Sequence, residues 1–207
     1  SGKGGTGKTS VTAALAALAE DFVLADCDVD AANLHLVARP AAAEAHPFIA
    51  GHLARIRPDD CADCGVCAEL CRFEAIDVLD GRHRIDALAC EGCGVCVRFC
   101  PEGAIDFPER HCGEWKLSET AFGPLVHARL DVGAENSGKL VSLVREQARR
   151  QAERLVMDLV LVDGPPGIGC PVTASLTGAD LTLLVTEPSL SGLHDLKRIA
   201  QLAAHFR

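Results

Sequence analysis

Eight cysteines of this chain fall into two short segments that repeat one another. Residues 61–77 read CADCGVCAELCRFEAID, and residues 90–106 read CEGCGVCVRFCPEGAID. The segments align without a gap, and nine of their seventeen positions are identical, including the four cysteines of each. Both follow the pattern C-x2-C-x2-C-x3-C. Because thiolates favour soft metals, the repeat predicts a metal centre built in two related halves.

Three chemistries compete for these cysteines: disulfide bonds, zinc and iron–sulfur clusters. The sequence contains no export signal and no apolar run of about 20 residues, so we expect a cytoplasmic protein without a membrane segment, in which stable disulfides are rare. Structural zinc sites usually draw their ligands from two separated C-x2-C pairs. Three closely spaced cysteines and a fourth three residues on are instead typical of cubane clusters, so we favour two 4Fe–4S clusters.

A second chemical motif opens the chain. Residues 2–9 read GKGGTGKT and match G-x-x-x-x-G-K-[ST], a loop whose backbone N–H groups surround nucleotide phosphates. Lys8 is expected to contact the β- and γ-phosphates, and the Thr9 hydroxyl to bind magnesium. The Ala- and Leu-rich residues 9–20 predict a helix, whose N-terminus favours anions. The residues expected to contact the nucleotide in this segment are Gly4, Gly5, Thr6, Gly7, Lys8, Thr9 and Ser10.

Apolar runs of strand length follow the glycine loop. They cover residues 22–28, 158–164 and 181–187, and each carries an acidic residue at or near its end. Helical stretches separate them, and residues 137–155 are the longest of these. Continuous apolar runs in this arrangement predict strands buried on both faces of a mostly parallel sheet flanked by helices, which is the α/β class of the P-loop NTPases.

The cysteine repeat interrupts this α/β pattern. Between about residues 52 and 110 helical periodicity is weak, and Asp80-Gly81 separates two short β-prone runs, which predicts a hairpin turn. We therefore expect a discontinuous P-loop domain, residues 1–51 and 111–207, with a small α+β domain at 52–110 inserted into it. A phosphate loop normally follows a strand, and the last residues are helix-like, so we expect the chain to be trimmed at both ends.

Residues 52–108 resemble the bacterial two-cluster ferredoxins, in which the fourth cysteine of each motif binds the cluster of the other motif. The resemblance implies that Gly65 and Gly94 form tight turns around the clusters. One departure is Arg72, which takes the place of the proline that usually follows the fourth cysteine. The implied ligand sets are Cys61, Cys64, Cys67 and Cys100 for one 4Fe–4S cluster, and Cys90, Cys93, Cys96 and Cys71 for the other.

The glycine loop contains a second lysine, and KGGTGKT resembles the deviant Walker A loop of the MinD/ParA/Mrp superfamily of P-loop ATPases. The resemblance implies that this residue, Lys3, reaches the nucleotide of a partner subunit. Residues 24–34 resemble the superfamily's switch I segment, with Asp28 orienting the attacking water and Asp26 supporting the magnesium site. Residues 159–169 resemble its switch II strand. The remaining implied contacts are Asp163 with magnesium, the Gly164 N–H with the γ-phosphate and Pro188 beside the nucleotide base.

The resemblance as a whole is to superfamily members that contain an inserted ferredoxin domain. It implies ATP as the nucleotide, magnesium-dependent hydrolysis and a nucleotide-dependent homodimer or heterodimer with a related ATPase. We expect nucleotide state to gate electron transfer from the clusters to an unknown redox or client protein. The alternatives are a carrier or assembly ATPase for iron–sulfur clusters, and a positioning ATPase whose clusters are structural or sensing. The net charge of −9 argues against a nucleic-acid partner. Cys112 and Cys170 are left without a role.

Overall fold

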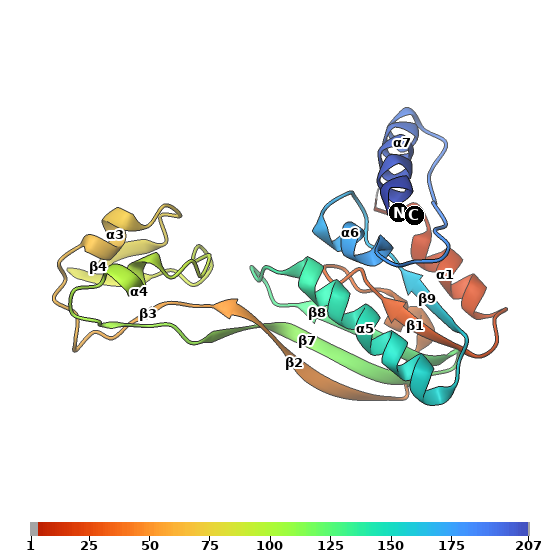
Figure 1. The fold of residues 1–207 in the computed structure, drawn as a ribbon, viewed down its shortest axis with the longest axis horizontal. Helices are drawn as coiled ribbons and strands as arrows, with labels where there is room; N and C mark the ends of the chain where they lie inside the picture. The colour runs from red at the N-terminus through yellow and green to blue at the C-terminus, as the bar shows by residue number, and fades with distance from the viewer. Residues whose placement is uncertain (1–3, 207) are drawn as a thin grey trace. The chain divides into compact units, whose positions relative to one another are not determined.

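The chain folds into two compact units (Figure 1). The structure, a computed structural model, describes residues 4–206. Unit 2 comprises Ile49–Cys112 and Val132–Ala134, and unit 1 comprises the rest of the described chain. The boundaries fall inside two long strands, β2 (Ala42–His52) and β7 (Glu109–Thr120), which lead the chain into and out of unit 2.

Unit 1 is built on a five-stranded sheet of order β2-β7-β8-β1-β9. Strand β1 (Phe22–Asp26) pairs in parallel with β8 (Gly123–Leu130) and with β9 (Leu159–Asp163), so the predicted parallel core is confirmed. Strand β7 pairs with β8 antiparallel, which the sequence did not predict. The reason is that β7 is polar and partly exposed, so it lacks the continuous apolar run that identifies a buried strand.

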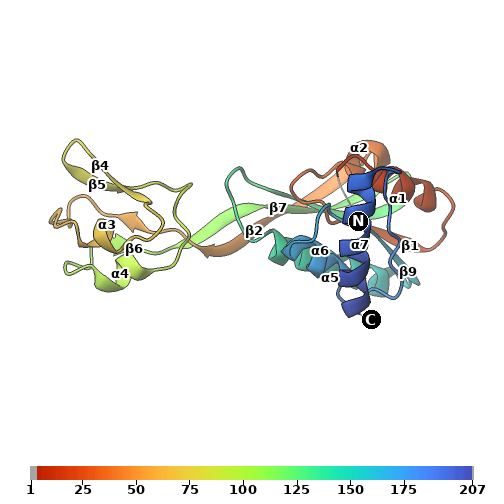
Figure 2. The same cartoon turned by 90° about the horizontal axis from the view of Figure 1, so that it is seen from above.

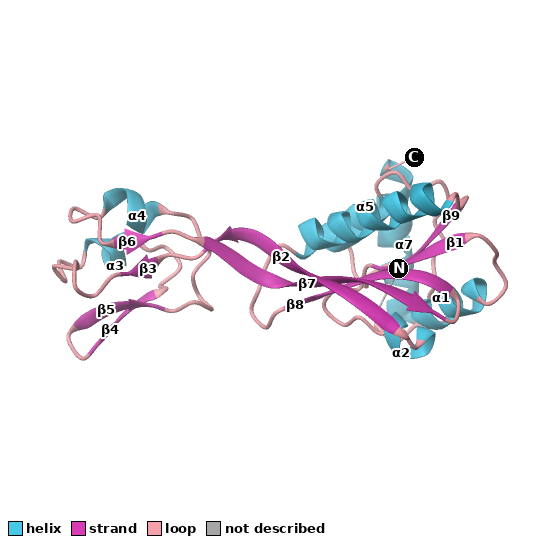
Figure 3. Cartoon of the chain, turned by 90° about the horizontal axis from the view of Figure 1, so that it is seen from below, coloured by secondary structure: helices cyan, strands magenta, loops and turns pink. Residues whose placement is uncertain are grey.

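Helices cover both faces of this sheet (Figure 3). Helices α1 (Lys8–Ala16) and α2 (Leu34–Ala38) share an apolar cluster with alternate residues of β1 and with Leu125 of β8. The longer helix α5 (Ser137–Leu155) packs on β1 and β8 and has the bounds that the sequence predicts. The helix predicted at 9–20 ends earlier, at Ala16. Every helix between residues 4 and 206 is too short or too polar to span a lipid bilayer.

The strand predicted at residues 181–187 is wrong. This segment carries no regular secondary structure, and Leu181 and Leu183 are 89% and 60% exposed. An apolar run becomes a strand only when a neighbouring strand satisfies its backbone groups, and no described strand pairs with it. The segment links α6 (Cys170–Leu176) to α7 (Leu190–His205), and only Leu184 packs into the apolar cluster between these two helices.

Unit 2 is a small α+β fold (Figure 2), and its apolar centre is formed by Ala54, Cys67 and Ile105 with their partly buried neighbours. Strands β3 (Arg55–Ile56) and β6 (Ile105–Asp106) pair antiparallel, and β4 (Ile76–Leu79) and β5 (Arg82–Ile85) form a hairpin. The hairpin turn is at Asp80-Gly81, as predicted, and both residues have positive φ. Two five-residue helices, α3 (Val66–Leu70) and α4 (Val95–Phe99), follow equivalent positions of the cysteine repeat.

Candidate functional site

The glycine loop leads directly into α1 in unit 1. Gly7 caps the helix with φ of 91°, a left-handed conformation that an L side chain would strain, and Lys8 is the first helical residue. The first intrahelical bond runs from the Val11 N–H to the Gly7 carbonyl, 2.9 Å away. The N–H groups of the preceding helical residues therefore lack an intrahelical acceptor. The N–H groups at the positive end of a helix form an anion site, which suits a phosphate.

Two carboxylates lie at the carboxyl ends of adjacent parallel strands in the same unit. Asp26 of β1 and Asp163 of β9 are paired in register, and the two residues are 0% and 2% exposed. The hydroxyls of Thr9 and Thr12 donate hydrogen bonds to Asp163, and the Thr12 bond to Oδ1 is 3.3 Å long. Within the described chain, Asp163 Oδ2 is buried without a hydrogen-bond partner. A buried carboxylate oxygen beside hydroxyls suits a hard cation such as Mg²⁺.

Asp26 also fixes the loop that follows β1. Its Oδ1 accepts the Asp28 N–H at 3.2 Å, and its Oδ2 accepts the Leu34 N–H at 3.1 Å. Burial, together with the charge of Asp163, raises the pKa of Asp26 to about 7. Asp26 therefore connects the end of the strand to the first residue of α2, a structural contact that the sequence pattern did not reveal.

Asp28 is half-buried and lies within the electrostatic reach of Lys8. Burial raises the pKa of the Asp28 carboxyl, and the Lys8 ammonium opposes that rise. Burial also raises the pKa of the Asp163 carboxyl, and the hydrogen bonds from Thr9 and Thr12 and the Lys8 ammonium oppose that rise. The structure thus brings Lys8, Asp28 and Asp163 together, although the three residues come from three separate segments.

The structure places the other residues that the sequence predicts as nucleotide contacts in several different segments of unit 1. Gly164 follows β9 directly, beside the Ser175 side chain of α6. Pro188 is exposed in the turn before α7. Around the glycine loop, Gly4, Gly5 and Ser10 are exposed, whereas Thr6 is partly covered. Lys3, expected to act on a partner subunit, lies outside the described residues.

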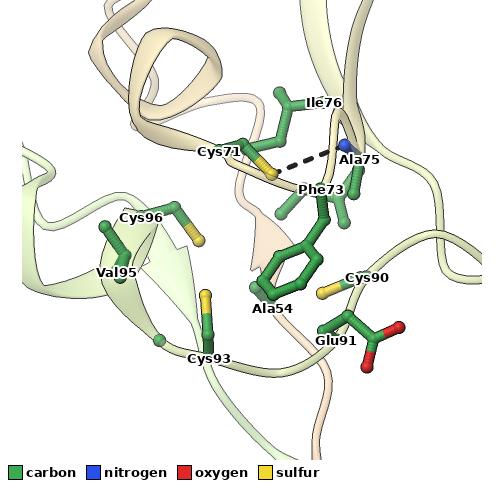
Figure 4. Close-up of a pocket in the computed structure, with 12 residues that line it drawn as sticks. Ala54, Cys71, Phe73, Ala75, Ile76, Cys90, Glu91, Cys93, Val95 and Cys96 are labelled. Carbon is green, nitrogen blue, oxygen red and sulfur yellow. Dashed lines mark hydrogen bonds between the residues drawn. The ribbon is translucent and has the colours of Figure 1, made fainter.

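The eight repeated cysteines of unit 2 gather around two separate pockets. One pocket is lined by Cys71 together with Cys90, Cys93 and Cys96, and Figure 4 shows these four side chains around a common space with the Phe73 ring. The other pocket is lined by Cys61, Cys64, Cys67 and Cys100. Each pocket therefore combines three cysteines of one repeat with the fourth cysteine of the other repeat.

Backbone N–H groups reach the sulfur atoms at equivalent positions of the repeat. The Ala75 N–H donates to Cys71 Sγ at 3.4 Å, and the Ala104 N–H donates to Cys100 Sγ at 3.3 Å. The glycines of each repeat, Gly65 and Gly94, have φ of 80° and 73° and cap α3 and α4. N–H donors stabilise negative charge on sulfur, so these positions suit thiolate ligands.

The donor set of each pocket bears on which metal group it suits. Each pocket presents four cysteines, three from one repeat and one from the other. Four thiolates are the donor set of an iron–sulfur cluster, so the residues present fit such a group. Within residues 4–206, no group of three or more His, Cys, Asp or Glu side chains is arranged to hold a single metal ion.

Residues outside the cysteine motif complete these pockets. Phe73, Ala54 and Ile76 line the pocket of the Cys90 set, and the Arg72 guanidinium lies 6.0 Å from the centre of the Phe73 ring. His83 of β5 lines the pocket of the Cys61 set. No pattern in the sequence pointed to Ile76 or His83 as pocket residues, because their positions depend on how the hairpin β4–β5 packs on the repeat.

The cysteines outside the repeat differ in their surroundings. Cys27 is fully buried at the end of β1, and burial raises the pKa of its thiol. Cys112 is also buried, and its thiol donates to the Ala50 carbonyl at 3.1 Å. Cys170 is exposed at the start of α6. Cys27 and Cys112 therefore act as small packing residues in the described structure.

A parallel sheet with a glycine loop before its first helix, and acidic residues at the ends of its adjacent strands, defines a nucleotide-binding domain of the P-loop class. The chain belongs to the CobQ/CobB/MinD/ParA nucleotide-binding domain family, which it matches over residues 1–207. This confirms the superfamily that the glycine loop predicted.

Two individual proteins are similar to this chain to different degrees. An uncharacterized protein of Methanocaldococcus jannaschii is 38% identical over 209 aligned residues, which cover 100% of this chain and 72% of that protein. The solved structure of the Pyrococcus furiosus cell division ATPase MinD is 22% identical and aligns with 99% of this chain at a TM-score of 0.47. The present chain spans 64% of the length of that MinD.

Proposed function

We propose that this protein is a nucleotide-hydrolysing iron–sulfur protein, in which ATP binding to unit 1 regulates electron transfer through two 4Fe–4S clusters held by unit 2. The observation that carries the proposal is the composition of the two cysteine pockets. Each contains four cysteines in the crossed combination typical of two-cluster ferredoxins. When bound, such clusters would supply one-electron redox chemistry, and the enclosing apolar side chains would limit access of water to them.

The arrangement around Lys8 supports ATP hydrolysis as the reaction of unit 1. The N–H groups at the start of α1 and the Lys8 ammonium would bind the phosphates, while Thr9 and Asp163 would hold Mg²⁺. Asp28, half-buried and close to Lys8, would orient the attacking water. Family membership supports nucleotide binding. The choice of ATP, and the role of Lys3 in a partner subunit, come from the resemblance of the loop to the MinD superfamily.

Two alternatives use the same fold differently. A carrier that delivers clusters to client proteins needs labile, accessible ligands. Of the eight cysteines, Cys64 and Cys93 are exposed, Cys67 is buried and the other five are partly exposed, so one ligand of each set is accessible. A positioning ATPase would keep its clusters in one redox state. Electron transfer is favoured over the carrier because each pocket has a full set of four cysteine ligands.

The cluster content is tested first. After anaerobic reconstitution, we expect about eight iron and eight labile sulfide per chain, with EPR signals from reduced 4Fe–4S clusters. Stoichiometric zinc, or only about four iron, would contradict the proposal. The measurement does not depend on nucleotide, so it separates the cluster assignment from the ATPase assignment.

Coupling between nucleotide and clusters is tested second, by redox titration with no nucleotide, with ADP and with a non-hydrolysable ATP analogue. Thermodynamic reciprocity requires cluster reduction to change nucleotide affinity by the same factor by which nucleotide favours reduction. A tenfold change in affinity corresponds to about 60 mV in a one-electron potential. Three superimposable titration curves would instead favour clusters that are structural or sensing.

A further inference from the structure

A large open pocket lies next to the Cys61 set in unit 2. It has a volume of about 780 Å³ and lies over β3 and over β5, the second strand of the β4–β5 hairpin. These strands are neighbours in the fold (Figure 3). The charged side chains around it are those of Arg55, Arg82, Arg84, His83 and Asp63.

Positive charge is concentrated in this pocket, although the surrounding chain is acidic. Residues 49–112 contain twelve Asp and Glu but only seven Arg and no Lys, and three of those arginines line this one pocket. The single acidic side chain in the lining, Asp63, lies 3.4 Å from the ring of His83 and accepts its backbone N–H at 3.1 Å. It therefore already has a partner other than the arginines.

Two arginines of the pocket differ from the neighbouring Arg57 in their hydrogen bonds and ion pairs. The Arg57 guanidinium binds Asp60, Asp106 and the Gly103 carbonyl, so its charge is satisfied inside unit 2. In contrast, the guanidinium groups of Arg55 and Arg84 make no hydrogen bond or ion pair with any residue of the described chain. Two fully charged groups are thus available to an external anion, because arginine stays protonated at every physiological pH.

The arginine pocket and the Cys61 pocket share a wall. Ile56, Cys61 and His83 line both of them. The His83 side chain is only 10% exposed and is held by Asp63, so it fills the space between the two pockets. A molecule bound against the arginines would therefore be separated from the cysteine set by single side chains.

We propose that this arginine pocket is the docking surface for the acidic face of a protein electron carrier. The inference rests on the proposed function. With an iron–sulfur cluster held by the Cys61 set, one electron would pass from the reduced carrier to that cluster, so that the carrier would be oxidised and the cluster reduced, and no bond would form or break. Weak electron-transfer encounters bury little surface and depend on complementary charge for their rate and orientation. A local positive surface beside a redox centre, on a chain of net charge −9, selects an acidic partner at that position.

The test uses the reconstituted full chain and a reduced, acidic plant-type ferredoxin as the probe. Stopped-flow absorbance gives the second-order rate constant for cluster reduction at low and high NaCl concentration. We expect the rate constant to fall with salt. The double substitution Arg55→Gln/Arg84→Gln should lower it about tenfold at low salt, since electrostatic steering raises association rates by about 10–1,000-fold. The matched control Lys197→Gln/Arg198→Gln removes the same charge at two exposed residues of α7 and should leave the rate constant unchanged.

Reduction by dithionite and iron content are measured on every variant. A chain that binds no iron, or whose clusters dithionite does not reduce, contradicts the proposed function. A chain with normal clusters, whose reduction by the ferredoxin is insensitive to salt and to the Arg55/Arg84 substitution, overturns the docking surface alone. Calorimetric binding of citrate that requires Arg55 and Arg84, together with an unaffected ferredoxin rate, would reassign the pocket to a small organic anion and also overturn it.

Discussion

Asp26 and Asp163 are separated by most of the chain, yet they lie opposite each other in register at the ends of the parallel strands β1 and β9. Both carboxyls are buried, and burial raises the pKa of each. Two carboxylates in such a position repel one another unless one is protonated or a cation lies between them. The pair is therefore a destabilising feature of the fold that a bound Mg²⁺ would relieve.

The first prediction concerns the pH dependence of stability in metal-free, nucleotide-free protein. The pKa of Asp26 is about 7 in the fold against an ordinary value of 3.8. Its stability contribution is therefore fully present below about pH 4 and is lost as pH rises through about 7. Asp26→Asn should remove this loss, so the stability of the wild type should fall relative to the variant by roughly 2–4 kcal/mol between pH 4 and pH 8.

Urea unfolding checks this, followed by fluorescence of Trp115, the one tryptophan of the chain, which lies in unit 1. Asp30→Asn, at an exposed residue nearby, is the control. The Asp26→Asn variant would lose one of the two backbone N–H bonds that the carboxylate accepts, which lowers stability equally at every pH, so the slope with pH is the readout. Parallel stability curves for Asp26→Asn and the wild type would show that the carboxyl is not protonated in the fold.

A second prediction concerns Lys8 at the start of α1. Lys8→Ala should weaken nucleotide binding by roughly 10–100-fold, because a charge-assisted contact with a phosphate contributes about 1.5–3 kcal/mol. Titration calorimetry with Mg-ATP measures the effect, and Lys139→Ala, at an exposed residue of α5, is the matched control. Equal affinities of Lys8→Ala and the control would exclude Lys8 from the phosphate site.

A third prediction concerns Asp28, whose proposed role is distinct from that of Lys8. Asp28→Ala should retain nucleotide affinity within a few-fold but lower the hydrolysis rate by about 100-fold or more, since a positioned acid–base residue contributes about 10²–10⁴-fold. Asp30→Ala, two residues away and exposed, should hydrolyse ATP normally. Phosphate release is the measurement. A variant of Asp28 that loses binding and turnover together would point to a structural role in the loop after β1.

Substitution of Cys71 tests whether each cluster takes its fourth cysteine from the other repeat. It follows α3 in the first repeat, yet it lines the pocket of Cys90, Cys93 and Cys96. Cys71→Ser should therefore damage the cluster of that set more than the cluster of its sequence neighbours, and iron should fall towards about four per chain. EPR of the reduced variant identifies the surviving cluster.

Two further substitutions complete that comparison. Cys100→Ser should damage the Cys61 set in the same way, because Cys100 lines its pocket. Cys112→Ser is the control, since this buried thiol contacts the Ala50 carbonyl outside both pockets. Loss of the cluster formed by Cys61, Cys64 and Cys67 in Cys71→Ser would mean that each repeat binds its own cluster.

Features that depend on neighbouring residues were predictable from the amino-acid sequence alone. The glycine loop predicted the start of α1, the helical periodicity predicted α5 to its final residue, and Asp80-Gly81 predicted the hairpin turn. Each follows from local backbone preferences and short-range hydrogen bonds, which depend on adjacent residue types. The repeated four-cysteine motif likewise identified the eight cysteines that line the two pockets.

Features that depend on which distant segments become neighbours were set by the folded chain. The antiparallel pairing of β7 with β8, the lack of a described strand partner for residues 181–187 and the register of Asp26 with Asp163 all depend on strand pairing. A strand is stable only when a second strand satisfies its backbone groups, and an apolar run does not reveal whether such a partner exists. The same reason explains why the sequence did not reveal that the Arg55 and Arg84 guanidiniums lack a partner within residues 4–206. Only the fold determines which charged side chains form ion pairs and which remain available to an external ligand.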